Sequence, residues 1–190
     1  MLAACNNSRN PDRPASSRTS DPPLRWHFVI IGILSDTHDR AEWMAAGLRT
    51  LRDAGAAFYI HCGDIGGQAC IDLLAGLPGA FVFGNTDFDR PGLSRYAASI
   101  DVPCYDPFAD LALDGKKVAV LHGDDYRLKQ RLLATQEHDY LFQGHTHVRA
   151  DQRVGRTRLI NPGALHRAAV KTVVTLDTAT DRLTPFEVKL

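Results

Sequence analysis

The sequence predicts an α/β fold in which two facing β-sheets carry helices on their outer sides. In the first half of the chain, apolar runs alternate with amphipathic segments in a β-α-β-α-β series, which is typical of a parallel sheet with crossover helices. In the second half, short β-branched segments are separated by turn residues, which indicates antiparallel strands. Clusters of metal-ligand residue types follow several apolar runs, so they are expected on loops at strand ends.

The elements of the first half follow from hydrophobic spacing. Residues 28–34 form a nearly continuous apolar run, as expected for a strand covered on both faces. Residues 42–54 place apolar side chains at helical spacing between Arg and Asp, which predicts an amphipathic helix. Short apolar runs predict strands over residues 57–60 and 80–83, and residues 68–75 predict a helix that ends before Gly76 and Pro78.

The elements of the second half are shorter. Residues 111–113 and 117–121 flank Asp114-Gly115, a dipeptide typical of hairpin turns. Residues 125–135 predict a helix, and residues 140–142 predict a short strand. The remaining strands are expected over residues 148–154, 157–160, 172–177 and 183–188, and we interpret them as an antiparallel sheet.

Length and composition bound the domain organisation. The 190 residues suffice for one domain with a substantial core. Residues 6–25 are rich in Ser, Asn, Pro, Arg and Asp and cannot bury enough apolar surface to offset the entropy of ordering them. We therefore predict a flexible tail over residues 1–25 and a single folded domain over residues 26–190.

Charge, hydropathy and cysteine content argue against a nucleic-acid-binding protein, a membrane protein and a disulfide-stabilised protein. Lys+Arg and Asp+Glu balance at 22 each, so no electrostatic argument favours non-specific binding to nucleic acid or to a membrane surface. No specific nucleic-acid binding is evident either. No stretch approaches the roughly 18 apolar residues of a membrane span. The 4 cysteines form no CxxC pair and are expected to be reduced thiols, which predicts a cytoplasmic protein.

The first residues, Met1-Leu2-Ala3-Ala4-Cys5, look like the end of a lipoprotein cleavage box. No basic region and no apolar run precede them, so no working signal peptide is predicted. The alternative is an exported lipoprotein whose true start lies upstream of the assigned one.

Four short clusters carry the chemistry. They read Asp36-Thr37-His38, Gly63-Asp64, Gly84-Asn85-Thr86-Asp87 and, near the end, His122-Gly123 followed by Gly144-His145-Thr146-His147. Asp36 and His38 are two residues apart, as are His145 and His147, and side chains at i and i+2 of an extended backbone point the same way. A carboxylate and an imidazole can therefore meet one ion. Mixed oxygen and imidazole ligands suit Mn²⁺, Fe²⁺ or Zn²⁺ better than Ca²⁺.

The size of the ligand set indicates two metal ions rather than one. The candidate ligands are Asp36, His38, Asp64, Asn85, His122, His145 and His147. Two divalent ions about 3.5 to 4 Å apart, bridged by a carboxylate and a water, are used for in-line phosphoryl displacement. A bound water whose pKa falls toward ~7 becomes the nucleophile, and the ions neutralise charge on the phosphate oxygens. We therefore expect hydrolysis of a phosphate ester.

The ordered motifs, with the turn Asn161-Pro162-Gly163-Ala164, resemble the calcineurin-like metallophosphoesterase superfamily and its small prokaryotic YfcE-like branch. The resemblance covers the chain from about Phe28 to the C-terminus and implies a four-layer αββα sandwich of mixed sheets with a dinuclear metal site at the strand ends. By motif position it implies a first metal held by Asp36, His38, Asp64 and His147. The second would be held by Asp64, Asn85, His122 and His145, with Asp64 as the bridge.

One position departs from the pattern of the family. Phosphatases of this superfamily commonly carry a His after the motif Asn, proposed to protonate the leaving group, and here that position is Thr86. A Thr hydroxyl is a poor acid near neutral pH, and diesters with good leaving groups need the acid least. Small phosphodiesterases of the superfamily often lack this His too, so Thr86 favours a phosphodiesterase over a protein phosphatase.

The predicted function is hydrolysis of small phosphodiesters or nucleotides by in-line attack of a metal-bound hydroxide. Mn²⁺ is the expected ion, with Fe²⁺, Zn²⁺ and Ni²⁺ as alternatives. The residues expected to act in catalysis are Asp36, Asp64, Asn85 and His122. The alternatives are a small-molecule phosphomonoesterase and a non-catalytic metal-binding scaffold like the retromer subunit, which resembles this fold. No ligand position here carries an apolar residue, which favours the enzyme. Self-association into an oligomer is compatible with the sequence.

Residues beside the clusters carry weaker predictions. Thr86, Asp87 and His166 are candidates for contacting substrate or for hydrogen-bonding a ligand. A turn cap is the alternative for Asp87, and a core or surface histidine bonded to backbone is the alternative for His166. His27, His61 and His138 lack motif context, and we expect them to be core or surface histidines bonded to backbone.

Overall fold

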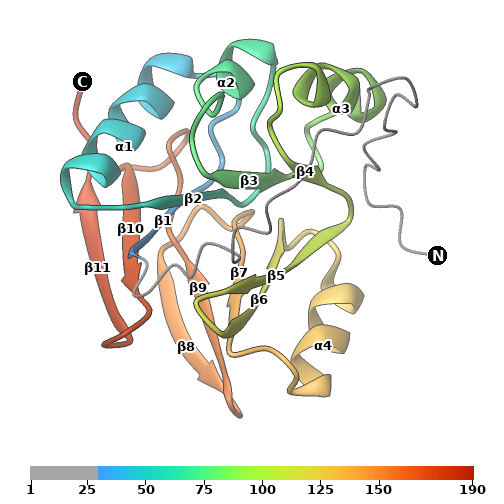
Figure 1. The fold of residues 1–190 in the computed structure, drawn as a ribbon, viewed down its shortest axis with the longest axis vertical. Coiled ribbons are helices and arrows are strands. Elements are labelled where there is room, and N and C mark those ends of the chain that lie inside the picture. The colour runs from blue at the N-terminus through green and yellow to red at the C-terminus, as the bar shows by residue number, and fades with distance from the viewer. Residues whose placement is uncertain (1–29) are drawn as a thin grey trace, which may run out of the picture.

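The computed structural model describes residues 30–190, which form two β-sheets packed face to face with helices on both outer sides (Figure 1). The predicted four-layer αββα sandwich of mixed sheets is confirmed. The predicted tail, the expected domain start at residue 26, His27 and residues 28–29 of the first strand lie outside the described residues. The tail and the single-domain organisation therefore stay predictions.

The six-stranded sheet is built mainly from the first half of the chain. Its parallel strands are β1 (Ile30–Leu34), β2 (Phe58–His61), β3 (Gly79–Val82) and β4 (Cys104–Tyr105). They are connected by α1 (Ala41–Asp53), α2 (Gln68–Asp72) and α3 (Arg90–Ser99), which lie together on the outer side of the sheet in Figure 1. β10 (Thr172–Asp177) pairs antiparallel with β1, and β11 (Arg182–Glu187) pairs antiparallel with β10. The strand order is therefore β11-β10-β1-β2-β3-β4.

The five-stranded sheet comes from the second half of the chain. Its strands are β5 (Phe108–Leu113), β6 (Lys116–Leu121), β7 (Tyr140–Phe142), β8 (Ala150–Val154) and β9 (Thr157–Asn161). β5 and β6 form the hairpin expected at Asp114-Gly115, and α4 (Tyr126–Thr135) connects β6 to its parallel neighbour β7. β9 pairs parallel with β7 and antiparallel with β8, so the order is β5-β6-β7-β9-β8.

The interpretation of the last four strands as one antiparallel sheet is wrong. β8 and β9 are an antiparallel pair, as are β10 and β11, but the two pairs belong to different sheets. Residue types predict a strand, whereas its neighbour is decided by which sheet edge lies within reach. Helix α3 and strand β4 were not expected; α3 is capped by the Asp89 side chain, which accepts from the Gly92 N–H at 3.0 Å.

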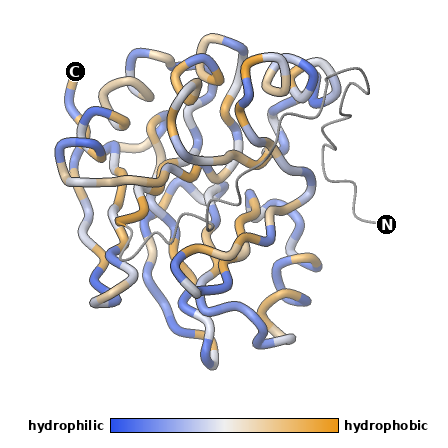
Figure 2. Tube along the Cα trace, in the orientation of Figure 1, coloured by the Kyte–Doolittle hydropathy of each residue, from blue (hydrophilic) through white to orange (hydrophobic). Residues whose placement is uncertain are grey.

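Three clusters of buried apolar side chains correspond to the three interfaces between the four layers. One lies between the six-stranded sheet and α1–α3, the second between the two sheets, and the third between the five-stranded sheet and α4. In β1, Ile31 and Ile33 belong to the cluster between the sheets and Leu34 to the helix side, so both faces of the strand are buried. Figure 2 shows apolar and polar residues alternating along the covering helices.

Two further expectations concern cysteines and membrane spans. Cys62 and Cys70 are buried and free, Cys104 is buried, and Cys5 lies outside the described residues. Within residues 30–190, no helix is long and apolar enough to cross a membrane.

An ionic cluster around Arg158 joins the two sheets at the edge far from α1–α3. The Arg158 guanidinium on β9 pairs with Asp151 at 2.8 Å and with Asp181, in the turn between β10 and β11, at 2.7 Å. Arg158 lowers the pKa of Asp151. Burial acts to raise the pKa of Asp181, but the hydrogen bonds from Arg158 and Tyr140 outweigh it and the pKa falls.

This cluster predicts a pH-dependent loss of stability. Both carboxylates have a folded pKa below the unfolded value of about 4, so their contribution is present above that pH and is lost as the pH falls through the folded pKa. Arg158→Met is expected to lower the free energy of unfolding by on the order of 1 kcal/mol at pH 7 and by less at pH 3. Urea denaturation at both pH values measures this, with exposed Arg52→Met as control. An equal loss at both pH values would contradict the assignment.

Candidate metal centre

Five loops at the ends of strands bring the sequence clusters together. Asp36 and His38 follow β1, Asp64 follows β2, Asn85 follows β3, His122 follows β6, and His145 and His147 follow β7. In parallel strands, the carboxyl ends lie at one edge of the sheet, and here such edges from both sheets meet. Loops from distant parts of the chain therefore share one centre.

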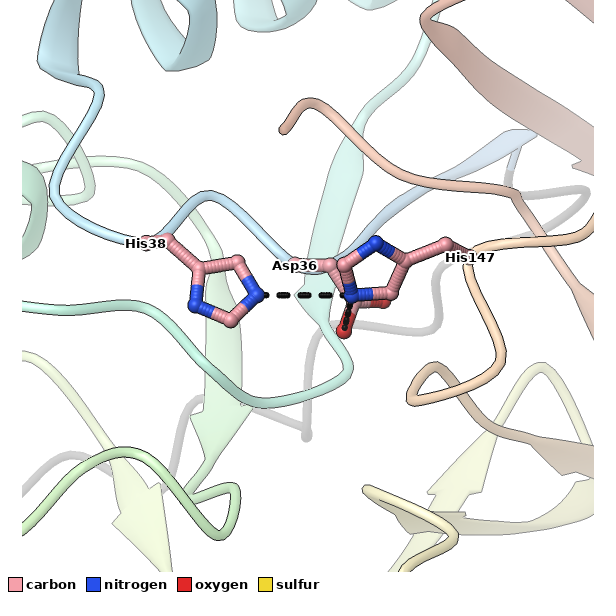
Figure 3. A group of neighbouring side chains, drawn as sticks. All are labelled: Asp36, His38 and His147. Atoms are coloured by element: carbon pink, nitrogen blue, oxygen red, sulfur yellow. Dashed lines mark hydrogen bonds and ion pairs between the residues drawn. The ribbon is translucent and has the colours of Figure 1, made fainter. Parts of the chain in front are cut away.

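The first group of neighbouring side chains is Asp36, His38 and His147. The Nε2 atom of His147 lies 3.3 Å from Asp36 Oδ1 and 3.4 Å from His38 Nε2. Figure 3 shows the three side chains close together, Asp36 and His38 from the loop after β1 and His147 from the loop after β7. One ligand atom from each lies within 4.8 Å of the others, which is close enough for a single ion to contact all three.

The second group contains Asp36, Asp64 and His122, whose ligand atoms also lie within 4.8 Å of one another. Asn85 Oδ1 lies 3.1 Å from His122 Nε2 and 3.2 Å from His145 Nδ1. Asp64 Oδ2 lies 3.3 Å from His122 Nε2 and 3.5 Å from His38 Nε2, so it faces both groups. All the predicted ligand residues thus lie in one centre, while their assignment to particular metals stays a prediction.

The donor set around His122 fits a cation. The Cys62 carbonyl oxygen lies 2.9 Å from His122 Nδ1 and can only accept, so Nδ1 carries a proton. Nε2 faces two acceptors, Asn85 Oδ1 and Asp64 Oδ2. When the ring is protonated, Nε2 donates to them, whereas in the neutral ring, the form that binds a metal, Nε2 is itself an acceptor. Three acceptors that converge need a positive charge between them. Imidazole, amide and carboxylate donors suit a borderline divalent metal.

The charges within the centre are strongly perturbed by burial. Burial raises the pKa of Asp36. Burial also acts to raise the pKa of Asp64, but hydrogen bonds from His122 and from the Thr86 N–H at 2.9 Å hold it well below its usual range. Burial acts to lower the pKa of His122, and Asp64 reverses this and raises it. The centre therefore keeps Asp64 ionised and favours a positive charge beside it.

The backbone of the ligand loops is not extended. Five ligand residues have positive φ: Asp36, His38, Asp64, His145 and His147. The premise that an extended chain turns Asp36 and His38 the same way is therefore wrong, although the two side chains do meet. Residues other than Gly rarely adopt this conformation, and it is concentrated at functional sites, where surrounding contacts maintain it.

Asp87 and Asn161 maintain these loops through backbone contacts. The buried Asp87 carboxylate accepts from Gly84 N at 2.8 Å, Gly66 N at 2.8 Å and Ile65 N at 3.3 Å, so it ties the loops after β2 and β3. Asp87 therefore caps its own turn at Gly84, as one alternative predicted, and also binds the loop after β2. Asn161 donates to Gly144 O at 2.8 Å and so supports the loop after β7. In the sequence, Asn161 is marked only by the Asn-Pro-Gly turn that contributes to the family resemblance.

Thr86 and His166 lie beside His38. The Thr86 hydroxyl is 3.3 Å from His38 Nδ1, which leaves His38 Nε2 to face the first group. The rings of His166 and His38 have centroids 5.2 Å apart. Burial, and then the positive charges of Arg40 and Arg167, lower the pKa of His166. Asn85 and His145 are exposed, so the centre opens to solvent on that side.

Of the histidines without motif context, His61 supports the first ligand loop. It is fully buried, its pKa is lowered by burial to about 3, and its Nε2 lies 2.7 Å from the Thr37 hydroxyl. This partner is a side chain rather than the expected backbone group. His138 likewise contacts a side chain, with its Nε2 3.2 Å from Asp110.

Removal of the Thr37 hydroxyl is expected to destabilise the fold. Thr37→Val keeps the side-chain shape but leaves the buried His61 Nε2 without its partner, which costs about 1–3 kcal/mol. Urea denaturation measures the loss. The control is Thr50→Val, whose hydroxyl donates to Ala46 O within α1 and whose loss should cost under about 0.5 kcal/mol. Equal stability of the two variants would contradict the role given to the Thr37–His61 contact.

The chain is similar to known phosphoesterases in both sequence and fold. The model of the calcineurin-like phosphoesterase superfamily domain matches residues 29–181. Phosphodiesterase MJ0936 of Methanocaldococcus jannaschii is 28% identical over 153 residues, which are 78% of this chain and 92% of that protein. A solved archaeal phosphodiesterase matches with a TM-score of 0.75 and 26% identity, over 84% of this chain and 100% of that chain.

More distant structures share the fold alone. YfcE, a phosphoesterase from E. coli, has a TM-score of 0.59 and 17% identity, over 85% of this chain and 100% of its own. Vps29 from Chaetomium thermophilum has a TM-score of 0.60 and 14% identity, over 84% of this chain and 97% of its own.

Proposed function

The chain belongs to the calcineurin-like phosphoesterase superfamily, and we propose that it is a divalent-metal-dependent phosphodiesterase acting on small phosphodiesters or nucleotides. The observation that carries the proposal is the convergence of carboxylate, amide and imidazole donors from five strand-end loops on one centre. The phosphodiesterase relatives support diesters as the substrate. A cytoplasmic location is part of the proposal.

Two metal ions, with Mn²⁺ as the first choice, would be held by the residues that the family resemblance assigned. Asp36, His38, Asp64 and His147 would hold one, and Asp64, Asn85, His122 and His145 the other. When bound, the ions would supply an activated water as nucleophile and positive charge against the phosphoryl oxygens. Fe²⁺, Zn²⁺ and Ni²⁺ are the alternatives.

Neighbouring groups of the protein fix the charge of Asp64 and the orientation of His122 in the absence of substrate. The Thr86 N–H and His122 keep Asp64 negative, and the Cys62 carbonyl orients the His122 ring. Such fixed contacts reduce reorganisation during the reaction. The Thr86 hydroxyl contacts His38 and is too weak an acid to protonate a leaving group. The general acid is therefore unassigned, and diesters with good leaving groups need such an acid least.

A phosphomonoesterase and a metal-binding scaffold are the alternatives. The likeness to Vps29 shows the fold alone and leaves the scaffold open. The intact donor set favours catalysis over a scaffold, because no ligand position carries an apolar side chain. Thr86 favours a diesterase over a monoesterase, since the position beside Asn85 carries no imidazole.

Hydrolysis of two chromogenic esters tests the proposal. The protein is stripped with a chelator, reloaded with Mn²⁺, and assayed with bis-p-nitrophenyl phosphate and p-nitrophenyl phosphate. We expect turnover only after reloading and a higher kcat/KM for the diester. A higher value for the monoester would favour the phosphomonoesterase. Absence of turnover, with fewer than one ion bound per chain, would favour the scaffold.

A further inference from the structure

The loop between β9 and β10 lies against the start of α1 at the edge of the metal centre. The His166 ring packs against His38, with centroids 5.2 Å apart. Five residues later, the Lys171 ammonium lies over the Trp43 ring, 4.4 Å from its centroid, in the first turn of α1. These two contacts, one at each end, place the segment 166–171 beside the segment 38–43.

Each of the two segments carries an exposed arginine between its contacts. Arg40 lies two residues after His38, and Arg167 lies directly after His166. Because the rings of His38 and His166 are in contact, the backbones of Arg40 and Arg167 lie near the same edge of the centre. The charges of both act on His166, and that of Arg167 also acts on His38. Within residues 30–190, neither arginine forms an ion pair.

The acidic residues of the same segment face another way. The Asp39 carboxylate accepts from the Gly67 N–H at 3.0 Å, at the start of α2. Burial, and then the charges of Asp39 and Glu42, raise the pKa of Cys70 on α2 to about 12. The arginine pair therefore keeps its positive charge at the edge of the centre.

We propose that Arg40 and Arg167 form a subsite for a second phosphate group of the substrate, beside the phosphodiester that is cleaved. This inference rests on the proposed function and names its substrate class: phosphodiesters that also carry a phosphate monoester, such as phosphorylated nucleotides. The guanidinium group presents donors in a planar fork that matches phosphate oxygens, which a lone ammonium does not. A simple diester uses the metal centre alone and gains nothing from the pair.

Equilibrium binding separates this subsite from catalysis. Calorimetry compares thymidine 3′,5′-bisphosphate with thymidine 5′-monophosphate, on protein loaded with Mn²⁺ and on chelator-treated protein. We expect the bisphosphate to bind about three- to tenfold more tightly at low salt, as two solvent-exposed ion pairs allow. The preference should shrink as salt screens the charges. In Arg40→Ala/Arg167→Ala the two affinities should become equal.

A kinetic comparison uses the matched substrates. These are the p-nitrophenyl ester of thymidine 5′-phosphate with and without a 3′-phosphate. The double variant should lose the preference for the 3′-phosphorylated ester and keep its rate on bis-p-nitrophenyl phosphate. Arg49→Ala is the control, because this exposed arginine lies nine positions along α1 from Arg40, roughly 13 Å away by helix rise.

The outcomes distinguish the two proposals. Equal affinity of wild-type protein for the two nucleotides, or a preference that survives in the double variant, overturns the subsite whatever the turnover. If no ester is hydrolysed but the bisphosphate still binds more tightly through the two arginines, the subsite stands and the proposed activity fails.

Discussion

Asp64→Ala is expected to reduce metal-dependent diester hydrolysis by at least about 10²-fold. Asp64 Oδ2 lies within 3.5 Å of imidazole nitrogens from both groups, so it is placed to contact ions at both. Its other oxygen, Oδ1, accepts from the Thr86 N–H, which orients the carboxylate. Loss of the side chain removes a predicted ligand of both ions and releases the contact to the loop after β3.

The measurement is kcat/KM on bis-p-nitrophenyl phosphate, together with the number of ions bound per chain. Asp53→Ala is the matched control, because this exposed carboxylate ends α1 away from the centre. Asp64→Asn separates charge from shape, since it keeps the volume and lowers metal content if the negative charge is needed. Wild-type turnover and metal content in both Asp64 variants would contradict the assigned role.

Gly84→Ala is the second change with a large expected effect. A Cβ atom at Gly84 would overlap the Asp64 carboxylate and the Asp64 backbone nitrogen, so the loops after β2 and β3 would have to separate. Overpacking of this kind costs about 1–3 kcal/mol. Because the displaced group is the predicted bridging ligand, we expect metal content and diester hydrolysis to fall together, by about 10²-fold in rate.

Gly76→Ala is the control for a general effect of replacing glycine. Gly76 is exposed with φ +74, and a Cβ there meets nothing within 4 Å, so Ala costs only the left-handed backbone strain of about 1–2 kcal/mol. It should lower the melting temperature and leave kcat/KM unchanged. If Gly84→Ala retains activity, or if Gly76→Ala loses it to the same extent, the steric account of Gly84 is wrong.

Most of the centre could be predicted from the chain because its signals are local. An apolar run followed closely by a ligand residue predicts a strand and the loop at its end, as at β1 with Asp36 and at β2 with Asp64. The helix-forming segment before β2 and the Asp114-Gly115 hairpin depend on the same short-range spacing. Where this spacing is weak, as in α3 with its Pro and Gly, the element was missed.

The sequence by itself determined the strands of the sandwich other than β4, and the residue types at their ends, because hydrophobic period and turn chemistry act over a few neighbouring residues. Only the tertiary structure decided which sheet received β8 to β11, since strand pairing depends on edges distant in the chain. It also decided the left-handed backbone of the ligand loops, maintained by Asp87 and Asn161 through contacts across loops. The contact between His166 and His38 was likewise decided by the tertiary structure, because packing between loops follows no local sequence period.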